Sequence, residues 1–202
     1  IQCDADVFIP PDQLMHAVRR VVNNQKAVVY PFTYCNPIPT SDVSGFLSQS
    51  ITSTTRSGYP KSVGVPVGGC VVRNTEGFFA SGMDNEHFIG WTSEDKERHE
   101  RHERLGYEIS RIEGPLFHLE HVAVRHLRDN HQFHQLGEFE RMRLKTLSDD
   151  QFRKEITSWA WLHNSPQPSP SIINAEDLSI TIPVRIDSPQ RLANLVVCTQ
   201  AL

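Results

Sequence analysis

The chain has 202 residues, 38% of them hydrophobic and 22% charged, and a net charge of −4 with neutral histidine. Its length suits one large domain, and its slightly acidic balance argues against DNA binding, which needs a basic surface. No apolar run approaches the roughly 18 residues that a membrane-spanning helix needs, so no membrane partner is expected.

The first helix is expected over residues 11–23. Pro11 and Asp12 suit a first helical turn, because proline fits there and an acidic residue favours the positive end of the helix. Apolar residues then recur at helical spacing (Leu14, Ala17, Val18, Val21 and Val22). Residues 1–9 predict a short strand or an extended lead, and residues 27–30 predict a short apolar strand.

The next segments predict loops and short strands. Prolines bracket a loop over residues 31–37, and the Ser-, Thr- and Gly-rich residues 38–62 predict an exposed hairpin or a wide loop. Strands are expected over residues 63–67, 70–73 and 78–80, with a turn over residues 74–77. This order of one helix followed by short strands is typical of an α+β fold with an antiparallel sheet.

The composition changes after Trp91. Residues 93–104 are almost wholly charged and have no apolar stripe, which predicts a solvated helix or a disordered loop. A strand is expected over residues 107–112, and residues 116–124 could form a strand or a helix. Only sparse apolar anchors interrupt the charged stretch that follows (Phe139, Met142, Leu144 and Leu147).

The last third begins with a capped helix. Ser148 is a favourable N-cap, and apolar residues follow at helical spacing (Phe152, Ile156, Trp159 and Leu162). Three prolines indicate a stiff, exposed segment over residues 166–170. Strands are expected over residues 178–182 and 192–197.

The four cysteines, Cys3, Cys35, Cys70 and Cys198, allow three ways of forming two disulfides. None of them has the Cys-x-x-Cys spacing of a zinc or redox motif. Two disulfides would place the protein in an oxidising compartment, and hence outside the cell. The chain starts at Ile1 with no signal-peptide pattern, which suits either a mature secreted form or a trimmed chain. The alternative is a cytosolic protein with four buried thiols.

Three short motifs then indicate a family. Tyr30-Pro31-Phe32-Thr33-Tyr34 follows the first helix, Pro66 to Asn74 reads PVGGCVVRN, and the chain closes on Asn194-Leu195-Val196-Val197-Cys198-Thr199. In these motifs the chain resembles the small guanyl-specific fungal ribonucleases and the ribonuclease-like secreted effectors of plant-pathogenic fungi. The resemblance covers residues 1–90 loosely and 190–200.

The resemblance implies a fold and a disulfide frame. The fold would be one α+β domain over residues 1–202, with the N-terminal helix packed on a curved antiparallel sheet. A large charged, helix-containing insertion would occupy about residues 91–170. The end-to-end disulfide of the family corresponds to Cys3 with Cys198, which leaves Cys35 with Cys70.

The family chemistry is incomplete in this sequence. Ribonucleases of this kind need a base, an acid and a positive charge on the phosphate. Phe32 stands where the family has its first histidine, and no glutamate lies between Gly45 and Pro66. Cys70 replaces the family's arginine, with Arg73 close by. Only His87 matches a catalytic position, the late histidine, and we expect little turnover from it.

RNA could still be bound without being cleaved. Tyr30 and Tyr34 could stack on bases, and Arg73 could contact a phosphate. The alternative is that both tyrosines are core residues of a strand.

Other site types have weaker motifs. The histidine pairs His99/His102 and His118/His121 suit one face of a helix, but no His-Glu-x-x-His string accompanies them, so no metal and no cofactor is expected. Ser53-Thr54-Thr55 and Glu138-Phe139-Glu140 follow the order of motifs in ADP-ribosylating toxins, without the early arginine strand.

The sequence therefore predicts a secreted, monomeric fungal virulence effector. It would act as a pseudoenzyme that binds host protein or RNA. The alternative is an active secreted enzyme, either a ribonuclease with displaced catalytic residues or an ADP-ribosyltransferase-like toxin.

Overall fold

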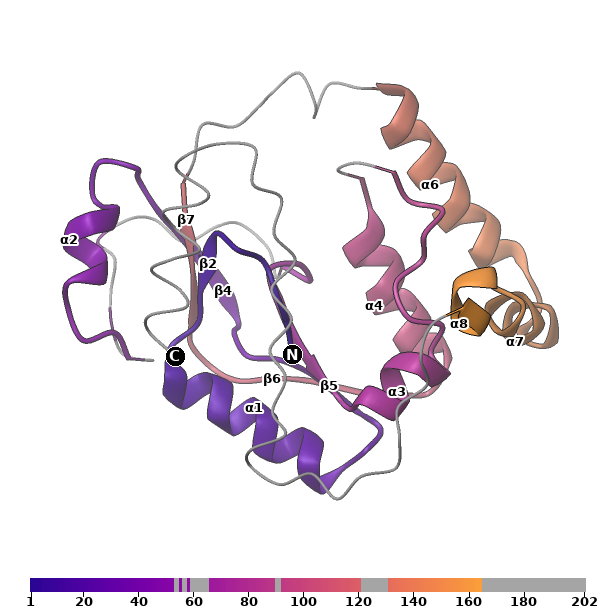
Figure 1. Ribbon diagram of the computed structural model, residues 1–202, viewed down its shortest axis with the longest axis horizontal. Helices are drawn as coiled ribbons and strands as arrows, with labels where there is room; N and C mark the ends of the chain where they lie inside the picture. Colours follow the sequence, from indigo (N-terminus) through magenta and orange to yellow (C-terminus); the bar gives the residue numbers. More distant parts are fainter. Residues whose placement is uncertain (53–54, 56–57, 59–65, 90–91, 121–130, 165–202) are drawn as a thin grey trace. The chain divides into compact units, whose positions relative to one another are not determined.

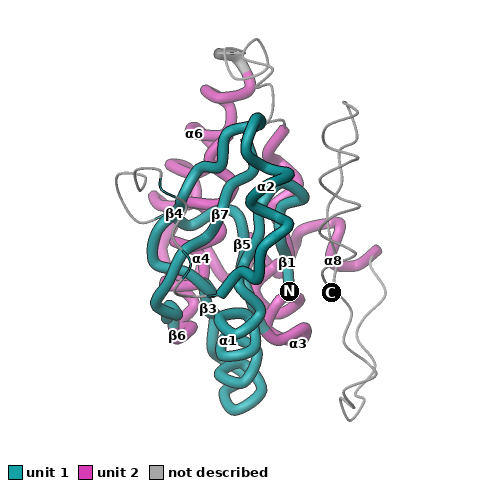
Figure 2. The backbone as a smooth tube through the Cα atoms, turned by 90° about the vertical axis from the view of Figure 1, so that its left-hand side faces the viewer, with its two compact units in different colours: residues 1–73, 109–123, 173–202 teal, residues 74–108, 124–172 magenta. Residues whose placement is uncertain are grey.

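The computed structural model describes residues 1–52, 55, 58, 66–89, 92–120 and 131–164 (Figure 1). The predicted α+β class is confirmed. The chain forms two compact units: unit 1 comprises residues 1–73, 109–123 and 173–202, and unit 2 comprises residues 74–108 and 124–172 (Figure 2). Within the described ranges, no helix has the length and apolar character needed to cross a membrane.

Unit 1 is built on two sheets. The first has the strand order β1-β5-β3-β6, with β1 at Gln2–Cys3, β5 at Cys70–Arg73, β3 at Ala27–Tyr30 and β6 at Glu108–Arg111. The second has the order β2-β7-β4, with β2 at Val7–Phe8, β7 at Pro115–Leu119 and β4 at Tyr34–Ile38. β4 and β7 run parallel, so the prediction of a purely antiparallel sheet is wrong there. A parallel pair needs a long connection, and about 80 residues separate these strands.

The predicted first helix is confirmed as α1, Pro11–Asn23. Its apolar face covers strands β3 and β5, where Ala17 and Val21 pack with Val29 and Val72. Gln13 is 1% exposed, and its amide nitrogen donates to the carbonyls of Pro31 (2.7 Å) and Pro115 (3.0 Å). The helix is therefore joined to both sheets of the unit.

Two predictions for residues 31–52 are corrected. The expected loop over residues 31–37 ends in strand β4, and the expected hairpin or wide loop contains the short helix α2, Val43–Leu47. Val43 and Phe46 of α2 are buried against the second sheet, where Phe46 lies 4.7 Å from Phe117 between ring centroids. Burial of these apolar side chains outweighs the weak helical pattern of the segment.

Unit 2 is helical in its described part. Its helices are α3 at Thr75–Ala80, α4 at Glu94–Arg104, α6 at His131–Thr146, α7 at Asp149–Thr157 and α8 at Ala160–Asn164. The predicted turn and strand over residues 74–80 are wrong, because the side chain of Asn74 accepts hydrogen bonds from the backbone of Glu76 and Gly77 and caps α3.

Of the two predictions for residues 93–104, the helix is confirmed as α4. The prediction that this helix is solvated is wrong. Glu97, Arg98, Arg101 and His102 of α4 are all buried. The helix predicted after Ser148 is also confirmed as α7, and Ser148 forms a full capping box with Gln151. Leu144, Phe152, Ile156 and Trp159 form the core of the unit.

Some predicted elements cannot be compared. The strands predicted over residues 178–182 and 192–197, and the start of the strand predicted over residues 63–67, lie outside the described residues.

Candidate functional site

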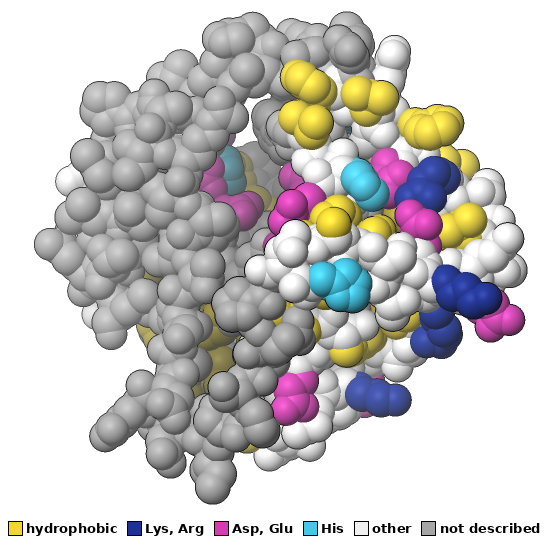
Figure 3. Space-filling model, turned by 45° about the vertical axis from the view of Figure 1, so that its right-hand side comes forward, with side chains coloured by type: hydrophobic (Ala, Val, Ile, Leu, Met, Phe, Trp, Pro, Cys, Tyr) yellow, Lys and Arg dark blue, Asp and Glu magenta, His cyan; other side chains and the backbone are white. Residues whose placement is uncertain are grey.

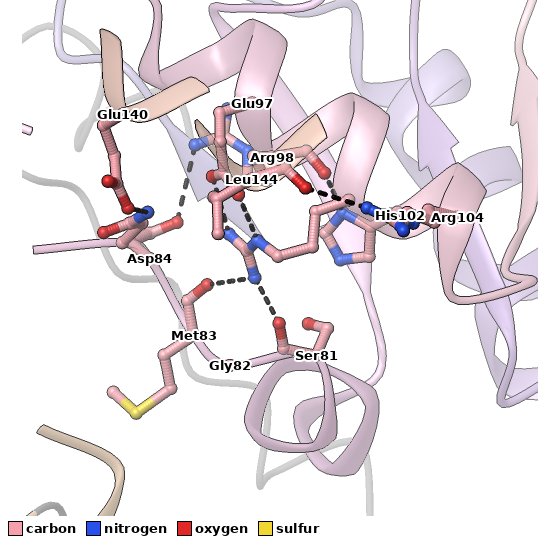
Figure 4. A network of polar contacts seen from close by, with 12 residues as sticks. Ser81, Gly82, Met83, Asp84, Glu97, Arg98, His102, Arg104, Glu140 and Leu144 are labelled. Carbon is pink, nitrogen blue, oxygen red and sulfur yellow. Dashed lines mark hydrogen bonds and ion pairs between the residues drawn. The ribbon is translucent and has the colours of Figure 1, made fainter. Parts of the chain in front are cut away.

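A tightly held loop, residues 81–87, leads from α3 to the predicted catalytic histidine. Arg101 of α4 donates to the carbonyl of Ser81 and, at 2.9 Å, to the carbonyl of Met83 (Figure 4). The indole nitrogen of Trp161 donates to the carbonyl of Gly82 at 3.1 Å. Three consecutive carbonyls of this loop thus accept hydrogen bonds from side chains of α4 and α8.

Arg101 can hold this loop because its own charge is compensated. Glu97, one helical turn earlier, accepts from Nε of Arg101 at 2.7 Å and from a terminal nitrogen at 3.2 Å. Both residues are almost completely buried. Arg98, beside them, pairs with Asp84 at 3.5 Å and with Asp95. A buried charge is tolerated only when it is paired and hydrogen-bonded in this way.

His87 meets Glu140 of α6 at the end of this loop. Nδ1 of His87 lies 3.2 Å from Oε1 of Glu140, and the histidine side chain is 50% exposed while the carboxylate is 11% exposed. Asn85 supports both residues: its side-chain nitrogen donates to Glu140 at 3.2 Å, and its side-chain oxygen accepts from the backbone N–H of His87 at 3.0 Å.

Glu140 is held in its ionised form. Burial alone would raise the pKa of its carboxyl, but hydrogen bonds from Arg143, Asn85 and His87, together with the charge of Arg143, lower this pKa below its ordinary value. Arg143 is bonded to Glu140 at 2.7 and 3.0 Å and to Glu155 at 2.7 Å, and these carboxylates raise the pKa of its guanidinium. Because an ionised carboxylate only accepts, Nδ1 of His87 carries the proton of their hydrogen bond.

Aromatic rings border the histidine. The ring of His87 stands edge-on to Trp161, with centroids 5.2 Å apart, and Trp161 lies 4.8 Å from Trp159. The guanidinium of Arg101 lies 5.3 Å from the ring centroid of Trp159. The imidazole is thus oriented by a carboxylate and by an indole, and its Nε2 can accept a proton, as a general base must.

The two predicted base-stacking residues, Tyr30 and Tyr34, lie in strands β3 and β4. Tyr30 and Phe32 are 0% exposed and Tyr34 is 9% exposed, so all three rings lie in the core of unit 1. Arg111 covers Tyr30 at 4.6 Å and donates to the carbonyl of Phe32 at 3.3 Å. The ring of Phe32 meets that of Tyr30 edge-on, with centroids 6.2 Å apart.

The remaining predicted site residues that the structure describes in unit 1 lie in its two sheets. Arg73 ends β5 and donates to the side-chain oxygen of Gln2 at 2.7 Å. Cys70 is in register with Cys3, whereas Cys35, its predicted disulfide partner, is in register with Leu116 of the second sheet. Cys198, the predicted partner of Cys3, lies outside the described residues.

A groove of about 430 Å³ lies between α1 and residues 112–113. Its walls carry side chains of both charges and the edge of one apolar residue (Asp12, Gln13, His16, Arg19, Arg20, Ile112 and Glu113). Two apolar residues of the same helix, Met15 and Val22, are 47% and 65% exposed. Positions 15 and 22 lie one turn before and one turn after Arg19, so α1 presents apolar and charged groups together.

Sequence reasoning did not connect His87 with Glu140, since 53 residues separate them and nothing in the local pattern joins them. Glu140 belongs to the Glu138-Phe139-Glu140 motif, which in the sequence suggests an ADP-ribosylating toxin. Ser53 and Thr54 of the companion motif lie outside the described residues. In the described ranges, no group of three or more His, Cys, Asp and Glu side chains is placed to hold a metal ion.

No family model, curated protein or solved structure matches the chain.

Proposed function

We propose that this chain is a secreted effector of ribonuclease-like ancestry that acts by binding a host protein, without turning over RNA. One observation carries the proposal: Phe32, at the position where the family has its first proton carrier, is fully buried beside Tyr30 and Arg111. A buried phenyl ring can neither take a proton nor contact a phosphate, so this position contributes packing alone.

The charge distribution favours protein over RNA as the partner. The net charge is −4, and on the face drawn in Figure 3 the described basic side chains lie beside acidic ones. Arg111 occupies a face of Tyr30, on which a base would have to stack. A phosphate backbone is held by an excess of Lys and Arg, which this pattern does not supply.

The outer face of α1 is the surface we assign to the host protein. Protein interfaces are enriched in Met and Arg and combine apolar contacts with a polar rim. Met15 and Val22 supply exposed apolar area, and Arg19, His16 and Asp12 supply the polar groups around it. A partner with a small apolar patch bordered by both charges would complement this face.

An assay on host extract tests the proposal. Protein captured by the wild-type chain should survive ribonuclease treatment and be lost with the double variant Arg19→Glu/Val22→Asp. The matched control is Met142→Asp, which places a charge at a half-exposed position of α6. Capture that disappears with ribonuclease, or that both variants retain, contradicts the proposal.

A second candidate is an enzyme, because an exposed imidazole oriented by an ionised carboxylate is a general-base arrangement. Cleavage of RNA by the purified protein should be measured together with His87→Ala and Glu140→Gln. Robust cleavage that both substitutions abolish would replace the binding proposal by this one. No cleavage, or cleavage unchanged by the substitutions, would exclude His87 as the base of a ribonuclease.

A further inference from the structure

Strands β1 and β5 place two cysteines directly opposite each other. The strands are antiparallel, with Gln2 opposite Val71 and Cys3 opposite Cys70. The same register continues to Asp4 and Gly69, where the backbone N–H of Asp4 donates to the carbonyl of Gly69 at 2.8 Å. Asp4 and Gly69 are therefore a hydrogen-bonded pair of the ladder.

Hydrogen-bonded and non-hydrogen-bonded pairs alternate along an antiparallel ladder. Cys3 and Cys70 are consequently a non-hydrogen-bonded pair, the kind whose Cα atoms approach to about 4.5 Å and whose side chains are closest. A disulfide accepts Cα separations of roughly 4.4–6.8 Å. The backbone of these strands thus already has a spacing that a disulfide can bridge.

The side chains also face each other. The thiols of Cys3 and Cys70 are within hydrogen-bonding reach, and this contact, followed by burial, raises the pKa of Cys3. Cys70 is 3% exposed and Cys3 is partly exposed. An oxidant can therefore reach the thiol of Cys3 before it reaches the buried thiol of Cys70. Cys35 lies in the second sheet, where Leu116 is opposite it.

We propose that Cys3 and Cys70 form a cross-strand disulfide that fixes the first strand of the protein to the centre of its sheet. The oxidant is a small-molecule disulfide such as oxidised glutathione. The thiolate of Cys3 attacks it, forms a mixed disulfide and releases one small thiol. The thiolate of Cys70 then attacks the sulfur of Cys3 and releases the second small thiol. Two protein thiols lose two electrons and two protons, and the oxidant becomes two thiols.

The bond would matter because β1 is an edge strand of two residues. Short edge strands have few hydrogen bonds and open readily. The covalent link would keep β1 paired whenever the protein is in an oxidising compartment, and reduction would release it. This inference depends on the register of the strands and is independent of the partner proposed for α1.

Peptide mapping tests the pairing directly. Tryptic cleavage places the four cysteines in four different peptides, residues 1–19, 27–56, 62–73 and 192–202. The full chain is equilibrated with oxidised glutathione, digested without reduction at a pH that prevents exchange, and analysed by mass spectrometry. We expect a linked species of residues 1–19 with 62–73, which separates into both peptides after reduction.

Other results overturn the proposal. A link between residues 1–19 and 192–202, a link between residues 27–56 and 62–73, or no linked species containing residues 62–73 would each exclude the Cys3–Cys70 bond. The control variant Cys35→Ser should retain the bond and show a melting temperature that falls on reduction. In a Cys35→Ser background, Cys70→Ser should lose that sensitivity to reduction. Retained sensitivity there would contradict the assignment.

Discussion

Arg101 donates a 2.9 Å hydrogen bond to the carbonyl of Met83, the one non-glycine residue with a positive φ (61°) in the ranges that the structure describes. A left-handed conformation is unfavourable for a side chain such as methionine and persists only where surrounding contacts hold it. The buried guanidinium of Arg101 is one of those contacts. The loop that ends at His87 therefore depends on α4 for its shape.

Replacing Arg101 by Met should destabilise unit 2 strongly. The substitution leaves Glu97 buried without its partner, and breaking a buried ion pair in this way costs about 3–5 kcal/mol. Urea denaturation followed by tryptophan fluorescence measures the change. The control is Lys96→Met on the exposed side of the same helix, which should change stability by less than about 0.5 kcal/mol. Equal effects of the two variants would contradict the role given to Arg101.

Position 82 requires a glycine, both for its backbone conformation and for the space around its Cα. Its φ is +94°, and a Cβ there would lie 2.6 Å from Ile156 and 2.7 Å from Trp159. Gly82→Ala should therefore combine about 1–2 kcal/mol of conformational cost with about 1–3 kcal/mol of overpacking. Gly106 also has a positive φ (+79°) but open space around it, so Gly106→Ala should show the conformational cost alone.

Gly45 completes this series as the control. It lies in α2 with open space around a Cβ and with no positive φ, so Gly45→Ala should stabilise the protein by about 0.5–1 kcal/mol. Melting temperatures of the three variants should rank Gly45→Ala above Gly106→Ala above Gly82→Ala. Any other order would mean that the packing around Gly82 is different from that described.

The capping box of α7 should be measurable by one substitution. The hydroxyl of Ser148 accepts from the backbone of Gln151 at 3.3 Å, and the side chain of Gln151 accepts from the backbone of Ser148 at 2.9 Å. Ser148→Ala should cost about 1 kcal/mol. Arg153→Ala, an exposed interior position of the same helix, should have almost no effect in the same thermal denaturation. A larger loss at Arg153 than at Ser148 would contradict the cap.

Glu140 should make the free energy of unfolding fall as the pH is lowered. Its pKa is lower in the folded protein than in the unfolded chain, so its ionised form adds stability above the unfolded pKa of about 4.3. That stability is lost as the pH falls through the lower folded pKa. Wild type should therefore exceed Glu140→Gln in free energy of unfolding at pH 7, and the gap should narrow below about pH 4. A gap that stays constant down to pH 3 would exclude the assigned ionisation.

The sequence predicted those helices whose defining features lie within the segment itself. The helix over residues 11–23 has its own apolar face, and α7 has its own cap, so both were recognised. Strand β4 was not predicted, because the flanking Pro31 and the internal Pro37 argue against a strand. Pro37 has no N–H to donate, but its strand is completed by pairing with β7, which comes from far along the chain.

The candidate site was predicted only in part. His87 was named for its resemblance to a family position, but its partners Glu140 and Trp161 come from helices distant in sequence. The burial of α4 was also missed, since hydropathy treats Arg101 as solvent-exposed. The spacing of Glu97 and Arg101, four residues apart on a helix, was the available signal for an ion pair.

The parallel pairing of β4 with β7 has a consequence for synthesis of the chain. Residues 34–38 find their strand partner only at residues 115–119, and residues 74–108 belong to the other unit. On the ribosome, unit 1 must therefore remain unfinished while the first part of unit 2 emerges. Pairings this far apart in sequence are slow to form and leave strand edges open. We expect newly made chains to expose the β4 edge until residue 119 has left the exit tunnel.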